Sequence, residues 1–402
     1  MTGLAALCRQ TLEENWREGE RDGVRYGYTA PSGGRYPWQW YWDSCFAAIA
    51  WRRFDPGRAQ TELESLLAAA TPEGFIGHTI FWDKPVDRVR ALFYNVRSRS
   101  DFTTSTIQPP MLAWAWRLAV GDPALEPAIV RHHEWIERER ALDGDGLIWI
   151  IQPDESGLDA LPTFDSSFGW RSDGLPGFPL LVARNRRLGF DVRRIAAAGG
   201  PLVCGVATNV LHGLSRLALG QPSLTPVIVE RLYDARLGLF RQLVRGRSGA
   251  TSRSSPPTVT WAALAPLALP DLPEAIGRRL VEEHLLNPRE FWLPVPPPSV
   301  AANDPHFSRR DRFLFLRRYW RGPTWLNAAW LLWLGLVRLG YTEASTQLGD
   351  RLSGAVLRSG LREYYDPYTG EGMGARGFSW SSLVLELSDP DPIAGAVAGA
   401  RL

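Results

Sequence analysis

Helical segments of two kinds alternate along the chain, and this alternation restricts the fold more than any other feature of the sequence. Some segments are apolar almost all round, such as residues 323–339, which is typical of a helix buried on every side. Others, such as residues 127–141, carry a charged face and fit an outer layer. Buried and amphipathic helices that alternate over 402 residues predict an all-α fold of two concentric helical rings.

The spacing of apolar residues gives the approximate bounds of these helices, with one more expected within Asp165–Leu188. No run of residues shows convincing strand alternation. The predicted helices are Leu4–Arg17, Ser44–Arg53, Arg58–Ala70, Met111–Val120, Pro127–Ala141, Leu202–Leu219, Val227–Leu237, Thr260–Leu267, Glu274–Leu285, Trp325–Leu339, Ala344–Arg358 and Trp380–Leu387.

The composition is that of an ordinary globular protein, and no shift in it separates two domains, so we expect one domain over residues 1–402. A net charge of +2 predicts no general attraction to nucleic acid or to anionic membrane. The longest apolar run, Trp325–Val337, is too short to span a bilayer, and the N-terminus does not resemble a signal peptide. The sequence therefore predicts a cytoplasmic protein; its oligomeric state stays open, and a homo-oligomer is compatible with it.

Cysteine and histidine residues are too scattered to indicate a metal centre. The 3 cysteines predict small buried residues, and the 6 histidines form no HExxH motif. Residues 372–377 match GxGxxG formally, but no strand precedes them, so the match does not predict a dinucleotide site. We expect no metal and no cofactor.

Long loops rich in Trp, Tyr, Gly and Asp connect the predicted helices, and such loops usually carry function. One of them, residues 152–165, contains Asp154, Glu155, Asp159 and Asp165. Its proline and glycine residues exclude a regular helix, so the four acids are not one solvated helix face. A turn of this kind can raise the pKa of one acid and keep another ionised. The alternative is a polar loop whose acids cap the next helix.

Aromatic residues crowd the segment Tyr36–Asp43, and not all of them can face one core. Trp40 and Trp42 suit the flat apolar faces of a sugar ring, and Asp43 beside them suits two of its hydroxyls. The alternative for Asp43 is a cap on the helix expected at Ser44.

Four further segments each carry one polar residue of interest. His78 lies in an apolar aromatic segment, where a lone histidine is more often structural. Gln108, ahead of two prolines, suits either a sugar hydroxyl or the tethering of a loop. Arg321 suits stacking between aromatic rings or pairing with an acid. Glu363, before two tyrosines, is the acid that a second loop would bring opposite Asp159.

Several of these segments together resemble glycoside hydrolase family 63, specifically the bacterial mannosylglycerate and glucosylglycerate hydrolases, with related patterns in family 37 trehalases. The stretches cover nearly the whole chain in family order, and the ESGxD and WRGPxW elements are the most specific. They are WQWYWDSCF (residues 38–46), GFIGHTIFW (74–82), STIQPP (105–110), QPDESGLD (152–159), YWRGPTW (319–325) and EYYDPYTGEGMGARGFSW (363–380).

The resemblance implies an (α/α)6 barrel with long active-site loops that hydrolyses α-glycosidic bonds with inversion, with Asp159 as general acid and Glu363 as general base. It also implies a sugar pocket lined by Trp40, Asp43, Gln108, Trp320, Arg321 and Trp380, with Tyr36 and His78 nearby. Asp154 and Glu155 would then support the turn, and Asp165 would cap the next helix.

Inversion places physical demands on the two acids, whose carboxyls should lie roughly 6.5–9.5 Å apart. We expect Leu158, Leu161 and Phe164 to desolvate Asp159 and raise its pKa, and donors or water to keep Glu363 ionised. Arginines suit the carboxylate of a glycerate leaving group, and the candidates are Arg317, Arg318 and Arg376.

The expected substrate is 2-O-α-mannosyl-D-glycerate, 2-O-α-glucosyl-D-glycerate or both, and the sequence does not choose between mannose and glucose. A hydrolase of a neutral disaccharide, similar to an α-glucosidase or trehalase, is the alternative enzyme. A non-catalytic sugar-binding barrel would not need two opposed carboxylates. A metal-dependent terpene cyclase is the weakest alternative, because QPDESGLD is not a DDxxD motif.

Overall fold

Six helical elements form a closed inner ring in the computed structural model. The structure describes residues 3–83, 102–169, 174, 176–246, 249–254, 257–310, 312–313, 316–317 and 319–388. Each inner element contacts the next, and the last of them contacts the first. In chain order the inner elements are α2 (Tyr41–Trp51), α5 (Leu112–Ala119), α9 (Val206–Ala218), the 3-10 helix η4 (Trp261–Ala268), α12 (Leu326–Arg338), and η6 (Ser379–Leu383) with α14 (Val384–Ser388).

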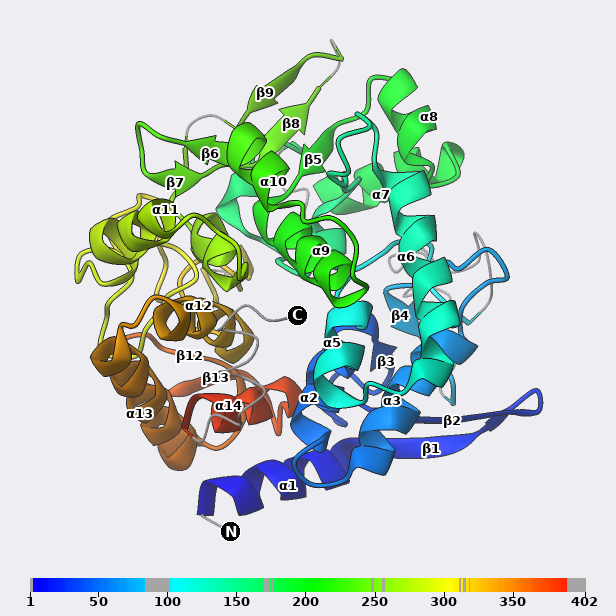
Figure 1. The fold of residues 1–402 in the computed structure, drawn as a ribbon, viewed down its shortest axis with the longest axis horizontal. Coiled ribbons are helices and arrows are strands. Elements are labelled where there is room, and N and C mark those ends of the chain that lie inside the picture. Colours follow the sequence, from blue (N-terminus) through cyan, green and yellow to red (C-terminus); the bar gives the residue numbers. More distant parts are fainter. Residues whose placement is uncertain are drawn as a thin grey trace.

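An outer helix packs against each inner element, which completes the (α/α)6 barrel (Figure 1). Inner and outer helices follow one another along the chain, as the alternation in the sequence predicts. The outer elements are α1 (Gly3–Asn15), α3 (Pro56–Ala68), α6 (Glu126–Arg140), α10 (Thr225–Leu232), α11 (Glu274–Arg279) continued by the π-helix η5 (Leu280–Leu285), and α13 (Thr342–Ser359).

The sequence of each ring explains its position. Every residue of α2 is buried, as is every residue of α12 up to Leu336, because both helices are surrounded by other helices. In the outer helix α6, one face buries Ile129, Trp135 and Ile136, while most of its charged residues lie on the other face. Among the described helices, none is both long and apolar enough to cross a membrane.

Helix bounds differ from the expected ones where apolar runs are ambiguous. Residues 202–219 do not form one helix: Leu202–Cys204 is strand β5, and Gly205 precedes α9. Residues 227–237 likewise contain the end of α10 followed by strand β6 (Tyr233–Asp234). The additional helix expected within residues 165–188 is α7 (Gly177–Arg187), and α8 (Val192–Ala197) follows it.

The structure also contains short antiparallel sheets, and the sequence did not predict these sheets. The longest is the hairpin of β1 (Trp16–Arg21) and β2 (Val24–Thr29), whose first strand is strongly charged. The other strands are β3 (Gln39–Trp40) paired with β4 (Thr79–Ile80); β5, β8 (Leu243–Arg245) and β9 (Thr251–Arg253); β6 with β7 (Leu239–Phe240); β10 (Arg312–Phe313) with β11 (Leu316–Arg317); and β12 (Arg362–Tyr365) with β13 (Gly372–Arg376).

Two of these small sheets position candidate site residues. The pairing of β3 with β4 places Trp40 opposite Thr79, so the aromatic segment and the His78 segment lie side by side. The β12–β13 hairpin carries Glu363 at an irregularity in its register, between Arg362 and Tyr364.

Candidate active site

Loops from most of the chain's length meet at a cavity of about 310 Å³. Aromatic rings and acidic or amide side chains form its wall, which is the composition expected of a site for a polar ligand with apolar faces. Its lining residues are Pro31, Tyr36, Trp40, Trp42, Asp43, His78, Gln108, Pro153, Asp154, Gly157, Asp159, Phe178, Tyr319, Phe378 and Trp380.

Ser156 and Gly157 fix the backbone conformation of the turn that leads to Asp159. The 3-10 helix η2 (Pro153–Ser156) ends at Gly157, whose φ of 70° lies in the left-handed region. A Cβ on Gly157 would come within 2.5 Å of the Trp42 ring, so only glycine allows the turn to pack on that ring. Ser156 Oγ accepts the backbone N–H of Leu158 at 3.0 Å and donates to the carbonyl of Pro153. The turn therefore leads directly from the Trp42 ring to Asp159.

Glu155 is a structural acid, as expected. Its carboxylate is fully buried and receives both terminal nitrogens of Arg140, at 2.6 and 2.8 Å. It also accepts the backbone N–H groups of Ile107 at 3.1 Å and Ile151 at 2.9 Å. Glu155 thus ties the acidic turn to α6 and to the loop that carries Gln108.

Asp159 lies at the cavity wall, but its surroundings differ from the expectation. The residue is exposed, whereas Leu158, Leu161 and Phe164 are buried in the main core. These apolar side chains therefore do not desolvate the carboxyl by themselves. A ligand in the cavity would have to supply that desolvation.

Glu363 is fully buried just behind the cavity wall and is surrounded by donors. Tyr36 Oη donates to its Oε1 at 3.1 Å, and the Tyr319 hydroxyl donates to the same oxygen. The backbone N–H of Ala375 donates to Oε2 at 2.8 Å. Among the described residues, these hydrogen bonds hold the carboxyl group of Glu363 in one orientation.

Asp43 belongs to the helix and does not cap it. The helix α2 begins at Tyr41, with Trp40 at the N-cap, so Asp43 lies in the first turn and its carboxyl lines the cavity. Burial raises the pKa of Asp43 well above its ordinary value, and the charge of Glu363 raises it further. A raised pKa favours the neutral form of Asp43, which can donate a hydrogen bond to a ligand.

Aromatic rings form the apolar part of the wall. Trp42 and Trp380 meet edge to face with their centroids 5.3 Å apart, and Tyr36 meets Trp40 in the same way at 5.8 Å. All four side chains line the cavity.

His78 and Gln108 lie at the cavity wall and are both held by neighbouring segments. The backbone of His78 accepts the N–H of Tyr41 at 3.0 Å and donates to the carbonyl of Thr106 at 2.8 Å. Gln108 Oε1 accepts the N–H of Trp42 at 3.0 Å, which fixes the orientation of its amide. Both side chains therefore present defined polar atoms to the cavity.

Two expected pocket residues lie elsewhere among the described residues. Trp320 is fully buried and stacks on Trp325 with ring centroids 3.7 Å apart. Arg321 forms two hydrogen bonds to Asp165, at 2.6 and 2.9 Å, so Asp165 holds this arginine instead of capping the next helix. Of the arginines suggested for a carboxylate, Arg318 and the side chain of Arg317 lie outside the described residues, and Arg376 is exposed and does not line the cavity.

The sequence missed several lining residues. Tyr319 opens the YWRGPTW stretch, Phe378 lies in the stretch that begins at Glu363, and Asp154 lies in the acidic turn, so all three were within reach of the motifs. Pro31 and Phe178 lie in no quoted motif.

Within the described part of the chain, no group of three or more His, Cys, Asp and Glu side chains is placed to hold a metal ion. Cys8, Cys45 and Cys204 are buried and free, as their scattered positions suggested.

Comparison with known proteins places the chain among glycoside hydrolases. The family model of the mannosylglycerate hydrolase MGH1-like glycoside hydrolase domain matches residues 36–219 and 221–381. Mannosylglycerate hydrolase of Thermus thermophilus is 28% identical, covering 90% of this chain and 96% of its own. Glucosylglycerate hydrolase of Mycolicibacterium hassiacum is 25% identical, covering 87% and 91%. A crystal structure of a GH63 mannosylglycerate hydrolase from Thermus thermophilus with Tris superposes with a TM-score of 0.79 at 26% identity, covering 96% of this chain and 99% of the other.

Proposed function

We propose that this chain, which belongs to the mannosylglycerate hydrolase MGH1-like family of glycoside hydrolases, cleaves the α-glycosidic bond between mannose or glucose and glycerate. Its membership makes it a glycosidase. The substrate is inferred from the names of relatives that cover about nine tenths of the chain, one a mannosylglycerate hydrolase and one a glucosylglycerate hydrolase.

The observation that carries the proposed mechanism is the convergence of two acids from distant loops on one cavity. Asp159 lines the cavity, and Glu363 is held by Tyr36 and Tyr319, which line the same cavity. Asp159, as the general acid, protonates the glycosidic oxygen, and Glu363, as the general base, takes a proton from the attacking water. Because water attacks the face opposite the leaving group, the product sugar has inverted configuration.

The remaining wall residues bind the sugar. Trp40, Trp42 and Trp380 offer apolar faces to the ring, while Asp43 and Gln108 offer hydrogen bonds to its hydroxyls. The sugar covers Asp159 when it binds, and the lost hydration then favours the protonated acid. We expect the enzyme to act as one barrel domain in the cytoplasm.

Initial rates on mannosylglycerate, glucosylglycerate and trehalose test the substrate. We expect kcat/KM to be at least about 100-fold higher on one or both glycerate glycosides than on trehalose. A site built for one leaving group leaves its polar groups unpaired when another leaving group binds, and this lowers kcat/KM by at least this order. Robust hydrolysis of trehalose with none of either glycerate glycoside would contradict the proposed substrate and favour a neutral disaccharide.

A further inference from the structure

Tyr41 lies between two tryptophans of the cavity wall, and the mechanism above gives it no part. It is the first residue of α2, and it is only 2% exposed. Its side chain is part of the core, while its neighbours Trp40 and Trp42 line the cavity. The backbone N–H and the hydroxyl of Tyr41 are both hydrogen-bonded to other segments of the chain.

The first of these segments is residues 74–78, which ends at the cavity. The backbone N–H of Tyr41 donates to the carbonyl of His78 at 3.0 Å. At the other end of the segment, the carbonyl of Gly74 lies 2.9 Å from Nδ1 of His132, a buried residue of α6. Nε2 of the same imidazole lies 2.9 Å from the hydroxyl of Tyr41. Tyr41 therefore holds one end of the segment directly and the other end through His132.

The second segment is residues 108–112, which leads from the cavity into α5. At its start, Gln108 Oε1 accepts the N–H of Trp42 at 3.0 Å. At its end, the hydroxyl oxygen of Tyr41 accepts the N–H of Leu112 at 3.3 Å. Leu112 is the first residue of α5, so its N–H has no acceptor within that helix. Two adjacent residues of α2 thus hold both ends of this segment.

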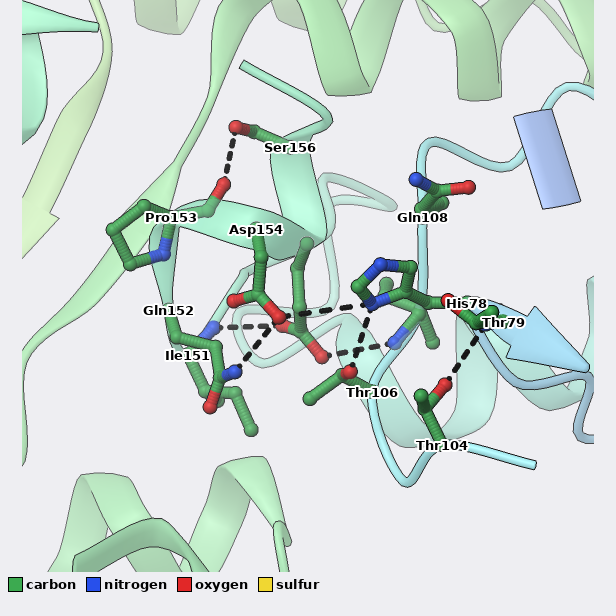
Figure 2. Close-up of polar contacts among 12 residues, drawn as sticks. His78, Thr79, Thr104, Thr106, Gln108, Ile151, Gln152, Pro153, Asp154 and Ser156 are labelled. Carbon is green, nitrogen blue, oxygen red and sulfur yellow. Dashed lines mark hydrogen bonds and ion pairs between the residues drawn. The ribbon is translucent and has the colours of Figure 1, made fainter. Parts of the chain in front are cut away.

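The two segments meet at the cavity. The backbone N–H of His78 donates to the carbonyl of Thr106 at 2.8 Å, and His78 Nδ1 lies 3.2 Å from Thr106 Oγ1. Figure 2 shows the contact between the two side chains, with Gln108 further along the same segment. His78 and Gln108 both line the cavity, as does Trp40. A shift of Tyr41 would therefore move three parts of the wall at once.

The partners determine the direction of each hydrogen bond around the tyrosine hydroxyl. A carbonyl only accepts, so the contact with Gly74 requires a proton on His132 Nδ1. Burial lowers the pKa of His132 to about 4, so the neutral ring has one proton and its Nε2 is an acceptor. The hydroxyl of Tyr41 therefore donates to Nε2, and its oxygen accepts the N–H of Leu112. Each donor from Leu112 to His132 has one acceptor.

We propose that Tyr41 and His132 are positioning residues for the sugar-binding wall. The hydroxyl of Tyr41, with His132 as its acceptor, holds the three wall segments in the arrangement that binds the sugar. The general acid and the general base come from other loops, so the pair acts on the placement of the sugar and not on proton transfer. The inference rests on the proposed function only in taking a sugar as the occupant.

Tyr41→Phe tests the proposal, because it removes only the hydroxyl. Calorimetry with mannose and glucose measures sugar binding by the full chain, and steady-state kinetics measure kcat/KM on the preferred glycoside. We expect sugar binding to weaken about 10-fold and kcat/KM to fall about 10- to 100-fold, since a small misplacement of a bound group has effects of this order. Unchanged values of both would overturn the proposal.

The control for a general loss of stability is Ile228→Val. Ile228 is a fully buried residue of the outer helix α10, and it does not line the cavity. Loss of its methyl group also weakens the core. We expect neither sugar binding nor kcat/KM to change by more than about 2-fold in this variant. A fall as large as that of Tyr41→Phe would overturn the proposal.

A double-mutant cycle tests the hydrogen bond between the two residues. In His132→Asn, the amide can replace Nδ1 and still reach Gly74, but no acceptor faces the hydroxyl of Tyr41. Adding Tyr41→Phe to this variant should therefore weaken sugar binding by less than about 2-fold, against about 10-fold in wild type. The same 10-fold loss in both backgrounds would overturn the proposal.

His132→Gln keeps the test decisive if Tyr41→Phe does not fold. Its amide oxygen can replace Nε2 and accept the hydroxyl of Tyr41, which the amide of His132→Asn is too short to do. His132→Gln should therefore bind the sugar at least about 3-fold more tightly than His132→Asn. Equal binding, or the reverse order, would overturn the proposal.

Nitrogen-15 NMR of histidine-labelled protein tests the proton positions without a ligand. At pH 7 we expect His132 to be neutral with its proton on Nδ1, and its signals are identified by their loss in His132→Gln. A proton on Nε2 would overturn the proposal, because the ring could not then accept the hydroxyl of Tyr41.

This proposal and the proposed substrate fail separately. If Tyr41→Phe weakens sugar binding as expected but neither glycerate glycoside is hydrolysed, the proposed substrate is wrong and the role of the pair stands. If wild type binds neither mannose nor glucose at millimolar concentration, the role of the pair in sugar binding is overturned.

Discussion

Gly374 lies directly against the carboxylate of Glu363: a Cβ on this glycine would come within 2.5 Å of Glu363 Oε2. Its φ of 68° is also one that other residues rarely adopt. Strand β13 therefore needs glycine here for two reasons: the backbone angle, and the room that the side chain of the proposed base requires.

Gly374→Ala should displace Glu363 and lower kcat about 100-fold, because a shift of about 1 Å in a reacting group has an effect of this order. The matched control is Gly377→Ala. Gly377 has a similar φ of 57°, but a Cβ added to it would meet no atom within 4 Å. Both variants should lose about 1 kcal/mol of stability from backbone strain, while only Gly374→Ala should lose activity. Equal activity of the two variants would show that contact with Glu363 does not matter.

Tyr319→Phe removes one hydrogen bond to Glu363 while keeping a ring in the wall. We expect kcat to fall about 10-fold to 100-fold, since a hydrogen bond to a charged group contributes about 1.5–3 kcal/mol. Steady-state kinetics on the preferred glycoside measure this change. An unchanged kcat would mean that the hydrogen bond from Tyr319 is not needed to hold the base.

Glu155→Gln leaves Arg140 buried without a countercharge and turns an amide N–H toward other donors. Breaking a buried pair in this way should lower the free energy of unfolding by about 3 kcal/mol. Urea denaturation of wild type and variant measures the difference. A loss below about 1 kcal/mol would contradict the structural role of Glu155.

Three buried histidines should make the fold sensitive to acid. His132, His133 and His212 lie together, and burial lowers the pKa of each below the ordinary value of 6.5, to about 4 for His132 and about 3 for His212. The unfolded chain therefore takes up protons near pH 6.5 while the folded chain does not. Their contribution to stability is fully present above that pH and is lost as the pH falls from it toward the folded values.

His212→Met isolates one of these contributions. Buried acids with raised pKa values, such as Asp43 and Glu62, make the fold more stable as the pH falls, which opposes the effect of the histidines. The pH dependence of the unfolding free energy is therefore compared between wild type and His212→Met. Between about pH 7.5 and about pH 5.5, wild type should lose about 1.4 kcal/mol more unfolding free energy than His212→Met. Urea denaturation at both pH values checks this, and parallel losses would contradict it.

The double ring could be predicted from the sequence because burial on all sides leaves a direct mark on a helix. Residues 326–336 are apolar around the whole helix axis except at Asn327, and the structure buries all of them. The β1–β2 hairpin left no such mark. Its first strand reads WREGER, whose side chains are half-buried or exposed, so neither alternation nor apolar content identifies it.

The sequence motifs predicted which loops form the site, but not which side chains of a loop face the cavity. Tyr319, Trp320 and Arg321 are adjacent in the sequence, yet the first lines the cavity, the second stacks inside the core and the third pairs with Asp165. Side-chain direction at such a turn depends on backbone angles that residue types do not reveal; Tyr319, for instance, has a φ of 22°. Asp154 was missed for a similar reason, since an acid in a turn does not show whether it is solvated or faces a cavity.

The central claim is that Asp159 and Glu363 act as the acid and base of an inverting hydrolase. Proton NMR of the first sugar released from an α-glycoside of glycerate tests it most directly, with Asp159→Asn and Glu363→Gln alongside wild type. We predict that wild type releases the β-anomer first and that each variant releases sugar at least about 1,000-fold more slowly. Initial release of the α-anomer, or near-normal release by either variant, would contradict the claim.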